Sequence, residues 1–366
     1  MTKEYIALGL MSGTSMDGVD ASIIQSDGET KYKVIKDKYF EYPQDTYKSL
    51  TEIKDKIKNS KDLENFSEEL NNIEKKITLF HASATTDILK DLKTNIDLIG
   101  FHGQTIYHKA QEKISKQLGN SKLLSQLVKK KIIYNFREND LKNGGEGAPL
   151  TPIFHKLLKE KFKFKLPVII LNIGGITNVT IIDTNNNILS YDIGPGNCLI
   201  DQWVRNISKY KYDVNGNIAK SGKVNKLILN QALENFEEVN KPKSYDIKDF
   251  DLSFVRGLSL EDGAATLTEY TSQIISENLK ITPIGPEKNI IITGGGRKNK
   301  FLIKIIEDKI NIPLNIIDNF GIDGDFVESQ AFAYLAIRSY LELPISFPET
   351  TGCSKACTGG RLIEFT

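Results

Sequence analysis

The stretch VIILNIGGITNVTIIDTNNNILSYD, residues 168–192, predicts much of the architecture by itself. An apolar run is followed by a Gly-Gly bend, a second apolar run, an Asn-rich turn and a third run, which is the pattern of three antiparallel strands. The same order of parts occurs near the N-terminus, where strand-like runs cover residues 5–10, 18–26 and 31–42. The sequence therefore contains the same three-stranded meander twice.

The segments that follow each meander also correspond. Short strands ending in glycine are predicted in NIDLIGFHGQT (residues 95–105) and in NIIITGGGRKN (residues 289–299). Each half then has a further short strand, at residues 130–136 and 312–320, and the second of these leads into a helix at residues 327–341. We expect two α/β domains of one topology that face each other across a cleft, rather than two unrelated domains that resemble each other by chance.

Composition favours a small molecule as the partner. The 366 residues include 48 basic and 47 acidic ones, a net charge of +1, so no basic excess points to nucleic acid or to an anionic membrane. Apolar runs are shorter than a membrane span, and MTKEYIALGL is too short and too acidic for a signal peptide. We expect a cytoplasmic protein without a membrane or nucleic-acid partner.

The three cysteines are too few for a disulfide framework, and their odd number fits reduced thiols. Cys353 and Cys357 have the C-x3-C spacing of a metal-binding pair, but no second pair accompanies them. Ordinary packing is therefore the favoured interpretation for both, and for Cys198.

The first bend, GLMSGTSMDGVD at residues 9–20, is rich in glycine, hydroxyls and carboxylates. Glycines let a backbone approach a ligand closely, and Thr14 and Ser15 offer N–H and O–H donors, so we expect a phosphate site. Gly174 and Gly175 in the second meander are expected to approach the same polyphosphate. A plain hairpin would need only one glycine. Neither a P-loop nor a dinucleotide-binding motif is present.

The triple glycine in TGGGRKN lies where a strand opens into a helix, a place that suits the sugar or adenine of a nucleotide. The alternative is a simple strand-to-helix loop. In SYDIGPGN, Asp192 ends a strand before a rigid Gly-Pro-Gly bend, and it is the best candidate for a general base in phosphoryl transfer. The alternative for Asp192 is a cap of the bend or of the helix that begins near Leu199.

Two further stretches offer polar groups for a sugar. His102 and Gln104 follow a strand in FHGQT, although a lone histidine is usually a satisfied structural residue. Arg137 lies in a glycine-rich loop, where it can meet a substrate carboxylate or pair with Asp140.

Taken together, these motifs closely resemble those of the 1,6-anhydro-N-acetylmuramic acid kinases, in the superfamily of sugar kinases, actin and heat-shock ATPases. The resemblance covers nearly the whole chain. The stretches that carry it are GLMSGTSMDGVDA, FHGQT, FRENDLKNGGEGAPLTPIFH, LNIGGITNV, YDIGPGN, DGAATLTEYT, GGGRKN and ESQAFAYLAIRSYLELPISFPETTGCS. The sequence departs from the family pattern at Glu146, where glutamine is expected, and in KPKSYD (residues 241–246).

The resemblance implies an α/β fold of duplicated actin-like (ribonuclease H-like) lobes, with mixed sheets flanking a central cleft. The lobes are placed at residues 1–135 plus 345–366 and at residues 136–344. It also implies an ATP-dependent, Mg²⁺-requiring enzyme of peptidoglycan recycling and a homodimer. The enzyme would open the 1,6-anhydro ring with water and phosphorylate O6, giving N-acetylmuramic acid 6-phosphate and ADP.

Residue roles carry over by motif. Asp192 would activate the water, Glu328 would contact the sugar unless it only caps its helix, and Asp17, Asp20 or Asp192 would handle Mg²⁺. The residues expected to contact ATP are Gly13, Thr14, Ser15, Met16, Asp17, Gly18, Val19, Asp20, Gly174, Gly175, Gly294, Gly295, Gly296 and Asn299. Two alternatives remain: an ordinary amino-sugar kinase that opens no ring, and a non-catalytic actin-like nucleotide switch.

Overall fold

The computed structural model describes residues 3–13, 15–236, 244–282 and 288–365. The chain divides into two compact units. Unit 1 comprises Met1–Lys163 and Phe326–Thr366, and unit 2 comprises Phe164–Asp325.

Unit 1 is built on a mixed sheet. Its strands are β1 (Tyr5–Ser12), β2 (Gly18–Ser26), β3 (Tyr32–Glu41), β4 (Leu98–Lys109), β5 (Ile114–Leu118), β6 (Lys131–Tyr134) and β12 (Arg361–Ile363). Among the described residues the strand order is β12-β6-β4-β1-β2-β3, with β5 paired to β4. Strands β4 and β6 run parallel to β1, whereas β2 is antiparallel to both β1 and β3.

Helices cover the sheet of unit 1. They are α1 (Gln44–Lys56), α2 (Asp62–Asn65), α3 (Ser67–Leu89), α4 (Ser121–Val128), α5 (Glu138–Lys142), α6 (Pro152–Phe162), α12 (Val327–Tyr340) and α13 (Pro348–Thr351). The alternate residues Leu8 and Leu10 of β1 belong to one buried cluster with Leu50 of α1 and Ile77 of α3. One face of the sheet therefore packs on α1 and α3, as the period of two along the strand requires.

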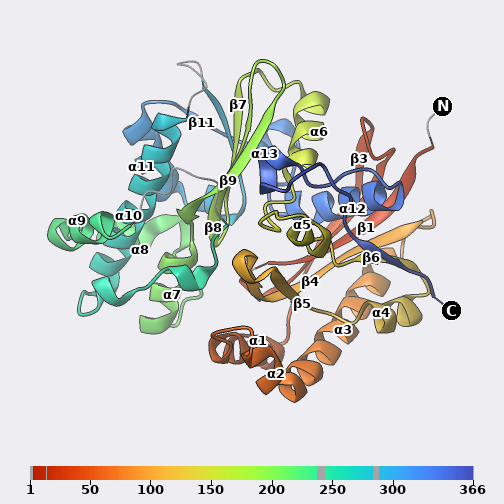
Figure 1. Cartoon of the computed structure of the whole chain (residues 1–366). Coiled ribbons are helices and arrows are strands. Elements are labelled where there is room, and N and C mark those ends of the chain that lie inside the picture. The colour runs from red at the N-terminus through yellow and green to blue at the C-terminus, as the bar shows by residue number, and fades with distance from the viewer. Residues whose placement is uncertain (1–2, 14, 237–243, 283–287, 366) are drawn as a thin grey trace. The chain divides into compact units, whose positions relative to one another are not determined.

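The other face of this sheet contacts α12, which runs beside β1 (Figure 1). The contact is backbone to backbone, because a Cβ added at Gly9 would lie 1.9 Å from Ser329 O. A Cβ at Gly100 of β4 would lie 2.3 Å from Phe332 O in the same way. Gly9 and Gly100 are paired across the two strands, so together they form the bare strip on which the helix lies.

Unit 2 contains the second sheet. Its strands are β7 (Val168–Ile173), β8 (Ile176–Ile182), β9 (Ile188–Pro195), β10 (Asn289–Thr293) and β11 (Leu314–Ile316). Its helices are α7 (Cys198–Ile207), α8 (Asn217–Ser221), α9 (Lys226–Glu234), α10 (Leu260–Ile281) and α11 (Lys300–Ile310). Ile169 and Leu171 of β7 share one buried cluster with Leu267 and Ile274 of α10. No helix in the described part of the chain has the length and apolar character needed to cross a membrane.

The two sheets follow the same path. The order β3-β2-β1-β4-β6 in unit 1 corresponds to β9-β8-β7-β10-β11 in unit 2. Strand directions agree as well, since β8 is antiparallel to its two neighbours and β10 and β11 continue parallel to β7. The predicted duplication and the α/β, actin-like fold class are confirmed. The strand predicted at residues 18–26 has the same bounds as β2.

The boundaries between the units differ from the predicted ones at 135/136 and 344/345. Helix α12 belongs to unit 1 because it lies on Gly9 and Gly100. Helix α6 also belongs to unit 1, where the ring of Phe154 contacts the rings of Tyr32 (5.3 Å between centroids) and Tyr334 (5.7 Å). Long-range packing therefore sets the boundaries.

Candidate active-site residues

The first glycine-rich bend joins β1 to β2 in unit 1. Met16 adopts a left-handed conformation (φ 58°), and its N–H donates to Gly13 O at 3.2 Å. The Ser15 hydroxyl donates to Asp17 Oδ1 at 2.5 Å. Thr14 lies outside the described residues. The bend is thus held by its own backbone and by one hydroxyl-carboxylate pair.

The glycines of this stretch serve different purposes. A Cβ at Gly18 would lie 2.3 Å from Phe40 O and close to the Tyr39 ring, so β3 requires that glycine. At Gly13 the nearest atom to an added Cβ is Ser15 Oγ at 3.8 Å. Packing therefore explains Gly18, as it explains Gly9, and leaves Gly13 as the glycine whose open surroundings fit close approach by a ligand.

Two members of the predicted ATP loop point their side chains into the protein. Val19 is fully buried and Met16 is 2 % exposed, both in the cluster beneath the sheet. Any contact that these two residues make with a nucleotide must come from the backbone. Asp17 and Asp20 are half-buried.

Gln104 supports the bend. Its side-chain N–H donates to Gly13 O at 2.9 Å across the neighbouring strand. Its Oε1 atom is buried and has no hydrogen-bond partner among the residues that the structure describes. Sequence reasoning assigned Gln104 to the sugar, whereas its observed hydrogen bond goes to the predicted phosphate bend.

His102 lies at an irregularity of the sheet. The register between β1 and β4 changes from Leu10–Phe101 to Met11–Gly103, which leaves His102 as the extra residue of a bulge. Its Nδ1 lies 2.7 Å from Gly103 O, and its Nε2 lies 2.9 Å from Nη2 of Arg137. Burial, followed by the charge of Arg137, holds the pKa of His102 well below its ordinary value. The neutral ring therefore donates from Nδ1 and accepts from Arg137 at Nε2.

Arg137 is positioned by two partners. Besides the contact with His102, its Nη1 donates to Gly147 O at 2.7 Å. Asp140, which sequence reasoning offered as an alternative partner, instead accepts hydrogen bonds from Gly147 N–H (2.6 Å) and from the Thr351 hydroxyl (2.5 Å). The guanidinium therefore contacts a backbone carbonyl and a neutral ring.

Glu328 is the second residue of α12 and is half-buried. A carboxylate in the first turn of a helix is stabilised by the helix dipole. This position gives Glu328 a structural explanation that does not require a sugar.

The second glycine bend joins β7 to β8 in unit 2. Gly174 O accepts a hydrogen bond from Asn197 N–H (2.8 Å), and Gly175 O accepts one from Gly196 N–H (2.9 Å). A Cβ at Gly196 would lie 2.3 Å from Gly174 O. The Gly-Gly bend therefore anchors the Gly-Pro-Gly segment that follows Asp192.

Asp192 also lies beside a bulge. The register changes between Thr177–Gly194 and Asn178–Asp192, so Ile193 is the extra residue. The Asp192 carboxylate is half-buried, and its Oδ2 accepts a hydrogen bond from Tyr245 N–H at 2.9 Å. Helix α7 begins after Asn197, so Asp192 is not its N-cap.

Asn178, opposite Asp192, is a polar residue that sequence reasoning missed. Its Oδ1 is buried and lacks a hydrogen-bond partner within the described residues. The signal was available, because an asparagine interrupts the otherwise β-forming run ITNVTII. The pairing of Asn178 with Asp192 could not be predicted, because the bulge shifts the register of the two strands.

In the triple glycine, as in the first bend, packing requires some of the glycines and leaves another in open surroundings. Cβ atoms at Gly294 and Gly296 would lie 2.4 Å from Asn172 Oδ1 and 2.2 Å from Ile173 Cγ2, whereas Gly295 is exposed with no atom within 4 Å. Asn299 caps α11, since its Oδ1 accepts from Leu302 N–H at 3.0 Å. Gly295 is the one member of this predicted set that packing leaves open.

Arg297 is a second residue that sequence reasoning missed. Its buried guanidinium forms ion pairs with Asp318 (2.7 Å), Asp325 (2.6 Å) and Asp323 (3.4 Å), and it donates to Gly294 O. Burial alone would lower the pKa of Arg297, but the hydrogen bonds with Asp318 and Asp325 raise it. The arginine fastens the acidic loop that follows β11 to the glycine turn.

The predicted magnesium carboxylates are not gathered into a closed cage. Among the described residues, none of Asp17, Asp20 and Asp192 belongs to a group of three metal-binding side chains. Mg²⁺ typically binds one or two carboxylates together with substrate phosphates and water, so separate carboxylates fit it.

Comparisons with known proteins agree with the motifs. A family model described as Anhydro-N-acetylmuramic acid kinase matches residues 4–364. A protein of that name from Pelagibacter ubique (strain HTCC1062) is 54% identical, with 100% of both chains covered. Another from Zymomonas mobilis is 38% identical, covering 98% of this chain and 99% of the relative.

A more distant likeness is to the solved structure of Acidaminococcus fermentans (R)-2-hydroxyglutaryl-CoA dehydratase component A. The identity is 11%, the TM-score is 0.45, and 92% of this chain and 99% of that chain are covered. This similarity is too weak to support an inference. The family model and the close relatives span the chain, and they make it a member of the anhydro-N-acetylmuramic acid kinase family.

Proposed function

We propose that this chain is an ATP-dependent kinase that opens 1,6-anhydro-N-acetylmuramic acid with water and phosphorylates O6. The products are N-acetylmuramic acid 6-phosphate and ADP. Family membership along the whole chain supports the substrate and the phosphoryl transfer. The observation that carries the mechanism is the half-buried Asp192 carboxylate, which lies beside a strand bulge and accepts a hydrogen bond from Tyr245 N–H.

Asp192 acts as the general base. It takes a proton from water while the water oxygen bonds to C1 of the sugar, and the C1–O6 bond breaks with its electron pair moving to O6. O6 then attacks the γ-phosphorus, the bond to the β,γ-bridging oxygen breaks, and ADP leaves. The proton on Asp192 returns to solvent. The hydrogen bond from Tyr245 N–H to Oδ2 helps to orient this carboxylate.

The bend between β1 and β2 binds phosphate. Gly13 lies in open surroundings and its carbonyl is held by Gln104, which together suit a closely approaching ligand. Gly295 is the open glycine proposed for the adenosine part. Asp17, Asp20 or Asp192 would hold Mg²⁺, which neutralises charge on the phosphates when bound.

Arg137 binds the lactate carboxylate that distinguishes muramic acid from other amino sugars. An arginine guanidinium is charged at neutral pH and can meet a carboxylate with two parallel N–H donors, and that of Arg137 is oriented by His102 and by Gly147 O. His102 is then a positioning residue, and it contacts the sugar only through Arg137. Glu328 remains a proposed sugar contact.

The test measures ADP release by the full chain with ATP and Mg²⁺. It compares no sugar, 1,6-anhydro-N-acetylmuramic acid, N-acetylmuramic acid and N-acetylglucosamine. The proposal expects rapid turnover only with the anhydro sugar. Equal turnover with N-acetylglucosamine would favour an ordinary amino-sugar kinase, and turnover that ignores every sugar would favour a nucleotide switch.

The proposal also includes a cytoplasmic location, where ATP is available, and a homodimer. Sedimentation equilibrium of the purified chain checks the assembly state. A single species at the monomer mass of 41.1 kDa over the accessible concentration range would remove the dimer from the proposal.

A further inference from the structure

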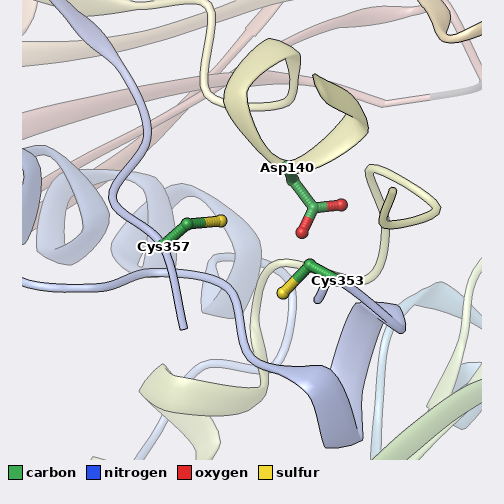
Figure 2. Close-up of side chains that lie close together, drawn as sticks. All are labelled: Asp140, Cys353 and Cys357. Atoms are coloured by element: carbon green, nitrogen blue, oxygen red, sulfur yellow. The ribbon is translucent and has the colours of Figure 1, made fainter. Parts of the chain in front are cut away.

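A buried carboxylate and two buried thiols meet in unit 1. Asp140 projects from α5, and Cys353 and Cys357 come from the C-terminal segment that follows α13 (Figure 2). One oxygen of Asp140 and the two sulfur atoms all lie within 4.8 Å of one another. Segments more than 200 residues apart in sequence therefore bring three metal-binding side chains to one point.

The charge of this cluster is not balanced by the protein. Asp140 is 1 % exposed, Cys353 is 2 % and Cys357 is 6 %. No ion pair to Asp140 occurs among the described residues, and its hydrogen-bond donors are neutral: Gly147 N–H, the Thr351 hydroxyl and the Cys353 thiol. Burying a carboxylate without a cation is costly, so a cation at this point is favourable.

We propose that Asp140, Cys353 and Cys357 bind one thiophilic divalent cation of the Zn²⁺ class. Two sulfur ligands and one oxygen ligand match the preference of Zn²⁺ and exclude Mg²⁺ and Ca²⁺, which take oxygen ligands only. Three protein ligands leave the fourth tetrahedral position to water.

The surroundings of the cluster fit a metal centre. Gly147 N–H and the Thr351 hydroxyl fix the two oxygens of Asp140, as outer hydrogen bonds commonly orient ligands. The backbone of Cys357 pairs with that of Ser346 in both directions, which holds its sulfur in place. The ligands need only small movements to close around an ion.

Binding has a countable proton balance. A cation binds cysteine as the thiolate, so each neutral thiol must give up its proton on binding. Each sulfur loses its proton as its bond to the cation forms, so one bound cation releases two protons.

The site would fasten the C-terminal segment to the loop that carries Arg137. Asp140 accepts from Gly147 N–H, and Gly147 O accepts from Arg137, so a metal held by Asp140 restrains that loop. At a free metal concentration of 100 times Kd, the Tm of the full chain should rise by about 3 to 4 °C.

The experiment titrates the reduced, chelator-treated full chain with Co²⁺ and follows the thiolate-to-cobalt charge-transfer absorption. The expected result is saturation at one equivalent, two protons released per ion, and loss of the band when Zn²⁺ is added. Cys353→Ser and Cys357→Ser should each weaken binding at least about 10-fold. Cys198→Ser is the matched control, because that thiol lies in the core of unit 2 and should leave the titration unchanged.

Three results would overturn the proposal. The first is no charge-transfer band from the reduced parent chain, and the second is a band that both Cys353→Ser and Cys357→Ser retain. The third is oxidation of Cys353 and Cys357 to a disulfide in a chain that binds no metal when reduced. If a variant fails to fold, the band and the proton count of the parent chain decide the matter. Kinase activity is not the readout, so this test is independent of the proposed function.

Discussion

The two sheets share one strand order, yet their central strands differ where a helix approaches. In unit 1, Gly9 of β1 pairs with Gly100 of β4 on the face that α12 contacts. In unit 2, the face turned away from α10 has Ile170 of β7 paired with Ile291 of β10, and both are fully buried. A common topology therefore does not fix the packing, because the size of one residue pair decides whether a helix backbone can touch the sheet.

The same contrast holds at the ends of the strands. Each sheet has a bulge near its glycine bend, at His102 in unit 1 and at Ile193 in unit 2. In unit 1 the bulge gives a buried neutral ring that holds an arginine, whereas in unit 2 it lies beside a half-buried carboxylate. One architecture, used twice, thus supplies two different chemical groups.

The largest expected effect concerns the carboxylate of unit 2. Asp192→Asn should lower kcat by about 10² to 10⁴, because the amide cannot accept the proton of the water. Steady-state kinetics with the anhydro sugar check this. Asp308→Asn, the same change at an exposed position of α11, is the control and should keep parent activity. A near-normal kcat for Asp192→Asn would remove the base assignment.

The next largest effect is expected on the stability of unit 1, at the glycine strip on which α12 lies. Gly9→Ala should lower the free energy of unfolding by about 3 kcal/mol, because the new methyl group collides with the backbone at Ser329. Ile170→Val in unit 2 should cost only about 1 kcal/mol, as a small loss of packing. Urea denaturation of both variants measures the difference. Equal costs would mean that the two sheets are packed alike.

Sequence reasoning predicted the duplicated strands, because alternation and glycine bends are local signals. It placed α12 in the wrong unit, since nothing near residue 327 states that Gly9, more than 300 residues earlier, leaves room for that helix. Its prediction of a sugar contact for His102 stays a prediction, and it did not foresee the contact with Arg137, because a bulge has no local signature in the sequence. It did not predict that Asp140 lies beside Cys353 and Cys357, because these residues are more than 200 positions apart in the sequence.

A third prediction concerns the stability of unit 1 at acidic pH. All four histidines lie in unit 1, and burial lowers the pKa of His81 to about 4 and that of His155 to about 3. Between pH 6.5 and these values the unfolded chain binds protons that the folded unit does not, so the stability of unit 1 falls as pH decreases. Each such histidine contributes a slope of about 1.4 kcal/mol per pH unit.

Hydrogen exchange at pH 7 and pH 5 checks the acid effect unit by unit. Protection should fall in β1 and β4 more than in β7 and β10. His81→Gln should reduce the pH slope of unit 1 by about 1.4 kcal/mol per pH unit, whatever it does to stability at pH 7. An unchanged slope would mean that His81 titrates normally in the folded unit.

The smallest effect on stability is expected at the open glycine of each unit. Gly13→Ala and Gly295→Ala should change the free energy of unfolding by less than about 0.5 kcal/mol, since neither added methyl group meets a close neighbour. Both should raise the KM for ATP if these glycines face the nucleotide. A large loss of stability, or an unchanged KM, would give them a purely structural role.

The most direct test of ring opening by water follows oxygen-18 from enriched water into the product. The proposed reaction puts one labelled oxygen on C1 and none on the phosphate for each ADP released. Unlabelled N-acetylmuramic acid 6-phosphate, kept in the same water for the same time, corrects for spontaneous exchange at C1. Label on C1 that rises in step with ADP is the predicted result, and unlabelled product formed with ADP would contradict it.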